Sequence, residues 1–276
     1  MPVQPTYPGI YLEELPSNDR TITAAPTSIT VFVGYTHPFK TKKFNEAVRI
    51  FDFTEYQREF GGFYLSEIFD QTVTYAVNQF FLNGGSDAYV VGLKAKYKAV
   101  AESDPLKQPS LPSNISGIVF TPLEPTDQMP IKVTINNLNA SGDTGDITII
   151  YNTQVETFRG VKVTGSIKDE AFIDNRINGV SALVTVKPGT TNYTTLTAKN
   201  EEKVTNFPAG VTNTFDSADF TKVFQDDSSL DKVSIFNLLA IPGLGADSNA
   251  IWSAALAFCE RKEAFRSEER RVGKEC

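Results

Sequence analysis

The sequence has little of the chemistry that metal sites and catalytic centres use. Its 276 residues include one histidine, His37, and two cysteines, Cys259 and Cys276. A structural zinc site takes four ligands from Cys and His, and a disulfide framework takes several cysteine pairs. This set can build neither, so we expect no metal ion and no cofactor. A Ser-His-Asp triad would have to use His37, the single histidine. His37 precedes Pro38 in an expected loop. We therefore interpret His37 as a surface residue and not a catalytic one.

Long apolar runs and an excess of positive charge are also missing. No stretch approaches the roughly 18–20 apolar residues that a membrane span needs. The N-terminus has no basic region followed by an apolar region, so we expect no secretory signal and synthesis in a cytoplasm. The net charge of −7 repels phosphate backbones and disfavours nucleic acid as the main partner. The 41% of hydrophobic residues are enough for a buried core.

The first 22 residues predict an extended arm. They contain four prolines, which disfavour helix. Apolar and other side chains alternate within a segment too short to carry a core, so we expect a strand that leaves its own subunit and pairs with a neighbour. Two acidic residues of this segment are either solubilising charges or partners of basic groups on that neighbour. The strand-donating residues are Tyr7, Pro8, Gly9, Ile10, Tyr11, Leu12, Glu13 and Glu14.

The next block has the pattern of an α/β fold. A nearly continuous apolar run at Ser28–Gly34 is typical of a strand covered on both faces, and Ala88–Leu93 is a second such strand. Between them, short helical turns are expected around Phe53–Phe60. An amphipathic helix is expected over residues 65–82, with Ser66 as a candidate N-cap and Gly84 in the C-terminal stop. Strand, helix and strand with short connections predict a βαβ unit and a parallel sheet.

Residues 94–116 hold three prolines and are predicted to be a linker. A β-rich domain follows, with one short helix at Asp169–Asn178. Its expected strands are Ile118–Thr121, Ile131–Ile135, Ile147–Tyr151, Val155–Phe158 and Ala182–Val186.

The α/β pattern returns near the end of the chain. Val233–Ile241 predicts a long strand, and Asp247 or Ser248 is placed to cap a helix with an apolar face. We therefore expect an α/β domain interrupted by an inserted β domain, with no further strand after the last helix. The expected division is an arm at 1–22, α/β domain at 23–100, inserted domain at 101–230 and resumed α/β domain at 231–265.

Residues 266–276 differ from the rest. The peptide RSEERRVGKEC is dense in charge and resembles the in-frame translation of a short-read sequencing adapter. We therefore expect the natural protein to continue with other residues after about Phe265. In that case Cys276 gives no information about the natural protein.

Several blocks, in order, resemble the contractile tail sheath family of phages and related injection machines. They cover most of residues 7–265. They are YPGIYLEELPS with RTITAAPTSITVFVGYT, FTEYQREFGG, FFLNGGSDAYVVGL, ETFRGV with RINGVSALV, and DKVSIFNLLAIPG.

The resemblance implies a structural protein and not an enzyme. It implies an incomplete domain of subtilisin-like topology around the inserted β domain. The implied partners are other sheath subunits in stacked six-fold rings, an inner tube protein, and baseplate and terminator proteins. Contraction of the resulting sleeve would drive the tube through an envelope, and the implied location is a virion tail or tail-like particle. Two alternatives stay open: a binding or adhesion module that reads a ligand with its β domain, and a degenerate subtilisin-type hydrolase.

Overall fold

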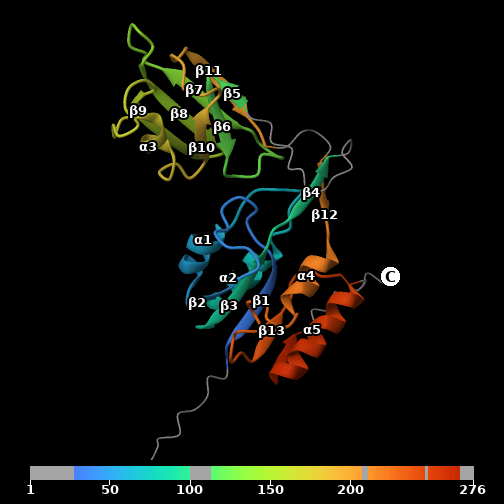
Figure 1. The fold of residues 1–276 in the computed structure, drawn as a ribbon. Helices are drawn as coiled ribbons and strands as arrows, with labels where there is room; N and C mark the ends of the chain where they lie inside the picture. The colour runs from blue at the N-terminus through green and yellow to red at the C-terminus, as the bar shows by residue number, and fades with distance from the viewer. Residues whose placement is uncertain (1–27, 100–112, 207–210, 246–247, 268–276) are drawn as a thin grey trace, which may run out of the picture.

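The computed structural model describes residues 28–99, 113–206, 211–245 and 248–267. The predicted arm, most of the predicted linker and residues 268–276 lie outside these ranges. The described chain has an α/β part and a β-rich part, joined by a narrow ribbon of two strands (Figure 1).

A five-stranded sheet forms the centre of the α/β part, in the order β14-β13-β1-β3-β2. Its neighbours pair in parallel except at β2, which runs antiparallel to β3. The predicted parallel pairing of the first two apolar runs is confirmed, with Thr30 opposite Ala88 and Tyr35 opposite Leu93. The strands are β1 (Thr30–Tyr35), β2 (Ala47–Ile50), β3 (Ala88–Leu93), β13 (Leu238–Ala240) and β14 (Phe265–Ser267).

Helices cover both faces of this sheet (Figure 1). Successive side chains of a strand point to opposite faces. Phe32 of β1 accordingly packs with residues of α1 and α2, whereas Val31 and Val33 pack with residues of α4 and α5. The result is a three-layer α/β/α arrangement. The helices are α1 (Phe53–Phe60), α2 (Thr72–Leu82), α4 (Ser217–Val223) and α5 (Asn249–Lys262).

Two elements of the α/β part are shorter than predicted. The helix expected over residues 65–82 begins only at Thr72, because the Ser66 hydroxyl accepts the amide protons of Ile68 and Phe69 and closes a separate short turn. Ser66 is therefore not the cap of α2. The strand expected at Val233–Ile241 is reduced to β13, because Val233 still lies in a turn that bonds to the Leu230 carbonyl.

The expectation that no strand follows the last helix is wrong. The amide of Phe265 donates to the Asn237 carbonyl at 2.8 Å, which returns the chain to the sheet edge, and β14 then pairs with β13. This three-residue strand crosses the predicted boundary at residue 265.

The β-rich part has a three-stranded sheet, β10-β6-β5, and a four-stranded sheet, β11-β7-β8-β9, with the short helix α3. Its buried cluster draws only on residues between Ile115 and Val204. Four expected strands are confirmed with extended ends, and the strand expected at Ala182–Val186 begins two residues later. The helix expected at Asp169–Asn178 is reduced to α3, and β11 carried no clear sequence signal. The elements are β5 (Ser113–Ile115), β6 (Ile118–Pro122), β7 (Ile131–Asn136), β8 (Thr144–Tyr151), β9 (Gln154–Lys162), α3 (Ile173–Ile177), β10 (Val184–Pro188) and β11 (Lys199–Val204).

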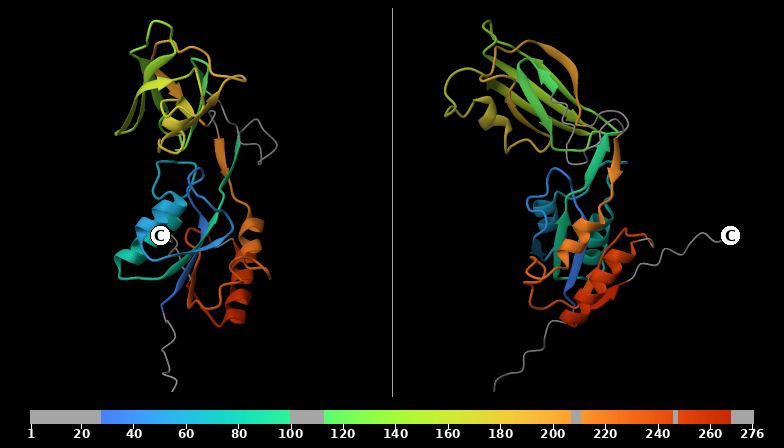
Figure 2. Two further views of the ribbon diagram at one scale, coloured as in Figure 1. Left: turned by 60° about the vertical axis from the view of Figure 1, so that its left-hand side comes forward. Right: turned by 45° about the vertical axis from the view of Figure 1, so that its right-hand side comes forward.

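An antiparallel ribbon joins the two parts. The strand β4 (Lys96–Ala99) leads out of the α/β part, and β12 (Val211–Thr214) leads back and pairs with it (Figure 2). The predicted linker at 94–116 thus begins with a strand. After the ribbon, Phe220 and Val223 of α4 enter the α/β core, although the sequence pattern placed them before the boundary at 230. Among the described helices, none combines the length and apolar character that crossing a bilayer requires.

Candidate functional site

The predicted strand-donating residues 7–14 lie outside the described residues, so their role stays a prediction. What the structure does describe is the set of sheet edges that a donated strand could meet. A free edge presents unpaired backbone groups, and short or side-chain-covered edges limit unwanted pairing. The α/β sheet ends in two short edges, β2 and β14.

The longest described edge, β9, is partly covered by side chains. The Glu156 carboxylate accepts from the Ser181 hydroxyl at 2.6 Å and from the Ala182 amide at 3.0 Å. Arg176 donates to the Arg159 carbonyl at 2.9 Å. These contacts occupy positions beside β9, and on the edge strand β2 the Ala47 amide donates to the Ser229 hydroxyl at 2.9 Å.

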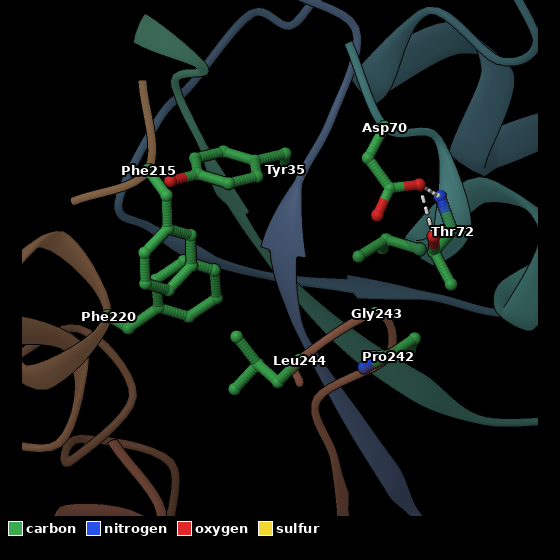
Figure 3. Close-up of a pocket in the computed structure, with 9 residues that line it drawn as sticks. Tyr35, Asp70, Thr72, Phe215, Phe220, Pro242, Gly243 and Leu244 are labelled. Atoms are coloured by element: carbon green, nitrogen blue, oxygen red, sulfur yellow. Dashed lines mark hydrogen bonds between the residues drawn. The ribbon is translucent and has the colours of Figure 1, made fainter. Parts of the chain in front are cut away.

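A pocket of about 180 Å³ lies at the carboxyl ends of β1 and β13 (Figure 3). The strands β1 and β13 are neighbours in the sheet. After β1 the chain continues on the side of β3, and after β13 it continues on the side of β14, so the strand order reverses between them. The pocket therefore lies at a topological switch point. Open α/β sheets place ligands at such points. Nine residues line the pocket: Tyr35, Asp70, Thr72, Val73, Phe215, Phe220, Pro242, Gly243 and Leu244.

The polar groups of this pocket are few. One Asp70 carboxylate oxygen accepts from the Thr72 amide at 2.9 Å and also from the Thr72 hydroxyl (Figure 3). Across the pocket, the Tyr35 ring packs edge-on against Phe220 at 5.3 Å, and burial raises the pKa of the Tyr35 phenol. A carboxylate facing aromatic rings suits a cationic group. The pocket lining contains neither serine nor histidine, so it holds no Ser-His-Asp triad.

His37 occupies a different place from the one expected. The prediction of a surface residue is wrong: its side chain is 0% exposed. The His37-Pro38 sequence starts a tight turn in which Nδ1 accepts the amide protons of Phe39 at 3.2 Å and Lys40 at 3.1 Å. Because Nδ1 accepts, the ring proton sits on Nε2, which donates to Glu124 Oε2 at 3.1 Å.

Glu124 belongs to the β-rich part, so this contact crosses between the two parts. The Lys40 ammonium binds its other carboxylate oxygen. Burial alone would raise the pKa of Glu124, but His37 and Lys40 outweigh it and the net pKa is lowered. Burial lowers the pKa of His37 and outweighs the opposing effect of Glu124. At neutral pH the cluster therefore holds an ammonium, a carboxylate and a neutral imidazole.

A second crossing contact lies three residues further along the same loop. Asp127 Oδ2 accepts from the Ser66 hydroxyl at 3.0 Å and from the Glu67 amide at 2.8 Å. Its Oδ1 is buried, and no described residue donates to it. Buried polar atoms of this kind are commonly met by ordered water.

The loop that carries both carboxylates is fixed to its own part. Tyr151 donates its hydroxyl proton to the Pro125 carbonyl at 2.7 Å. The Thr126 amide and hydroxyl both donate to Asn206 Oδ1, and Asn206 returns its amide proton to the Thr126 hydroxyl. Glu124 and Asp127 are thus presented by a rigid segment.

Three further groups of residues have structural roles. Lys42 and Lys43 form ion pairs with Glu59 and Glu46 on the surface. Phe80 and Phe81 pack on the core between α2 and the sheet. Gly84 and Gly85 follow α2 and therefore end a helix instead of opening a phosphate loop.

The comparisons with known proteins bear on the fold. No family model matches the sequence, and no curated protein matches it. A sheath tail protein from Listeria innocua is 14% identical and aligns with a TM-score of 0.46, covering 87% of this chain and 45% of the other. A sheath tail protein from Desulfitobacterium hafniense is 11% identical with a TM-score of 0.49, covering 92% of this chain and 50% of the other. The chain spans about half the length of these two sheath tail proteins.

Proposed function

We propose that this chain is the N-terminal part of a contractile tail sheath subunit, a structural protein and not an enzyme. The observation that supports this most is the series of sequence blocks between residues 7 and 265, which resembles the sheath family in order and spacing. Each block alone is short, whereas their order along a whole chain is specific. The pocket lining contains neither serine nor histidine, which fits a structural role better than a hydrolase with a Ser-His-Asp triad.

Assembly through the N-terminal arm follows from the physics of sheet edges. An arm without a core satisfies its backbone groups by adding a strand to a neighbour's sheet. Each hydrogen bond contributes about 1 kcal/mol net, so one donated strand stabilises a contact by a few kcal/mol. Repetition over many subunits makes a strong lattice, and a head-to-tail contact that does not close produces a helical sleeve. Linkage by a donated strand would also let neighbouring subunits rotate during contraction without separating.

The proposed partners are other copies in stacked six-fold rings, an inner tube, and baseplate and terminator proteins. In this proposal the β-rich part is an insertion in a domain of subtilisin-like topology and faces outward from the sleeve. The separate buried clusters of the two parts support an insertion. Its outward position comes from the family resemblance alone.

The test is electron microscopy of the full-length natural protein, expressed with its neighbouring genes. Striated hollow cylinders are expected.

Deletion of residues 1–20 should abolish the cylinders while leaving far-UV circular dichroism unchanged, because the arm contributes to assembly and not to the body. Cylinders of normal length after the deletion would refute the role of the arm. A monomer that binds a carbohydrate or protein ligand would favour the binding-module alternative.

The role of the two acidic residues of the arm is tested by the double variant Glu13→Lys and Glu14→Lys. If both pair with basic groups of a neighbour, assembly should weaken, and the loss should shrink as added salt screens the charges. Equal assembly at every salt concentration would identify them as solubilising charges.

A further inference from the structure

The junction between the two parts has the elements of a hinge. Among the described residues, the chain crosses it in the ribbon of β4 and β12, and hydrogen bonds cross it at two further places. An isolated two-stranded ribbon is marginally stable and readily twists or bends. The relative position of the two parts therefore depends on the contacts of Glu124 and Asp127.

We propose that His37, Lys40 and Glu124 form a latch that holds the β-rich part against the α/β part, and that protonation of His37 releases it. We call these three residues the latch. The proposal concerns the hinge within one chain and does not depend on the proposed sheath function.

The geometry around Nδ1 explains why a proton would open the latch. In the neutral ring this nitrogen accepts two backbone amide protons, those of Phe39 and Lys40. Once Nδ1 is protonated it becomes a donor, and three donors then face one another. The turn has to open or the ring has to leave, and either change moves Lys40 and Nε2 away from Glu124. The His37 side chain is fully buried, and burial disfavours a charged imidazolium.

Three ionisable side chains face His37. Lys40 and Glu124 face it directly, and the Tyr64 ring packs edge-on at 4.9 Å. Burial raises the pKa of the Tyr64 phenol, so that group stays neutral in acid. Asp127 lies on the same loop as Glu124, at the second contact.

The direction of the pH effect follows from linkage. The pKa of His37 is lower in the latched state than its ordinary value of 6.5, so the open state binds more protons in acid. The latch is fully stable above pH 6.5 and weakens as the pH falls through the lowered value. The pKa of Glu124 is also lowered, from 4.5, so its carboxylate adds to the loss only below that pH.

The test uses the 276-residue chain with ¹⁵N-labelled histidine, because a single histidine gives one assignable imidazole. At pH 7.5 the spectrum should show the neutral form with its proton on Nε2. Small-angle scattering over the same titration should show the maximum dimension growing at the pH where the imidazole gains its second proton. Amide exchange in the ribbon and in loop 123–130 should rise by about tenfold or more at that point.

Three results would overturn the proposal. One is a proton on Nδ1 at neutral pH, and another is a constant molecular dimension through the imidazole titration. The third is growth that coincides with loss of far-UV circular dichroism and with a change in the fluorescence of Trp252 on α5, because acid would then unfold the chain instead of opening the junction.

His37→Asn separates the latch from the local turn. The asparagine carbonyl can accept the amide protons of the turn, as Nδ1 does, but the side chain is too short to reach Glu124. The variant keeps the turn and with it the contact of Lys40 with Glu124, but it has no imidazole to protonate. Its maximum dimension should therefore not change between pH 7 and 5. Glu59→Gln is the matched control, because it removes an ion pair that α1 makes with Lys42 within the α/β part. Its pH profile should follow the unchanged chain. A His37→Asn protein whose dimension still grew between pH 7 and 5 would contradict the latch.

Discussion

At the scale of single residues, the buried hydroxyl pair of Tyr56 and Thr74 shows how polar groups are satisfied inside this core. Both residues are 0% exposed, and their hydroxyl oxygens lie 2.8 Å apart between α1 and α2. The Tyr56 ring is stacked between Phe53 and Phe60, with ring centroids 5.5 and 5.2 Å away. The ring supplies the packing and the hydroxyl supplies the specific contact between the two helices.

This pair permits a double-mutant test. Tyr56→Phe leaves the Thr74 hydroxyl without its partner, and Thr74→Val does the same to Tyr56, so each should cost about 1–3 kcal/mol in the free energy of unfolding. The double variant removes both groups and should cost clearly less than the sum. Urea unfolding followed by circular dichroism measures all four proteins. Strictly additive costs would show that the hydroxyl groups do not depend on each other.

At the scale of elements, two helix ends offer a matched pair of glycines. Gly61 ends α1 with a φ of 88°, and Gly84 follows α2 with a φ of 92°. A Cβ at Gly61 would lie 2.5 Å from Lys40 Cβ and 2.9 Å from His37 Cβ, whereas a Cβ at Gly84 would meet nothing within 4 Å. The two positions thus share a left-handed backbone and differ in the space around it.

Alanine at each position separates backbone strain from crowding. Gly84→Ala should cost about 1–2 kcal/mol, the strain of a left-handed L-residue. Gly61→Ala should cost at least about 1 kcal/mol more, because the turn that carries His37 and Lys40 has to move. Urea unfolding of the two variants gives the difference. Equal losses in the free energy of unfolding would mean that this turn shifts without a measurable cost.

Elements with strong periodicity were predictable from the sequence, and those shaped by side-chain contacts were not. Ala88–Leu93 forms a strand over its predicted bounds, because an apolar run between turn signals has few alternatives. The start of α2 was misplaced, since Ser66 caps a separate turn and Asp70 binds the first amide of the helix, Thr72. Local patterns do not say which of two capping residues is used.

The candidate site was less predictable than the fold. His37 and Glu124 lie 87 positions apart, and no pattern within either segment indicates that they meet. The His37-Pro38 dipeptide correctly indicated a turn but suggested exposure, since histidine beside proline is common in surface loops. Burial came from Tyr64 and from a carboxylate of the other part, which only the tertiary structure brings together.

At the scale of the whole molecule, the buried clusters divide along the ribbon. The cluster of the β-rich part lies between Ile115 and Val204, and the clusters of the α/β part draw on residues before 96 and after 219. The two sets share no residue. Each part therefore has the apolar core that an independent folding unit needs.

We predict that the fragment of residues 113–206 folds by itself. Its cluster includes Phe120, Ile131 and Ile147, each 0% exposed, and none of the clustered side chains comes from outside the fragment. Urea should unfold it in one cooperative transition, and its amide NMR spectrum should be well dispersed. As a control within the fragment, Phe120→Ala should lower the free energy of unfolding by about 3–5 kcal/mol, the usual cost of emptying a buried aromatic site. Val155→Ala, at an exposed position of β9, should change it by less than about 0.5 kcal/mol. A fragment without a cooperative transition would show that the β-rich part needs the α/β part to fold, and the insertion would then be no separate domain.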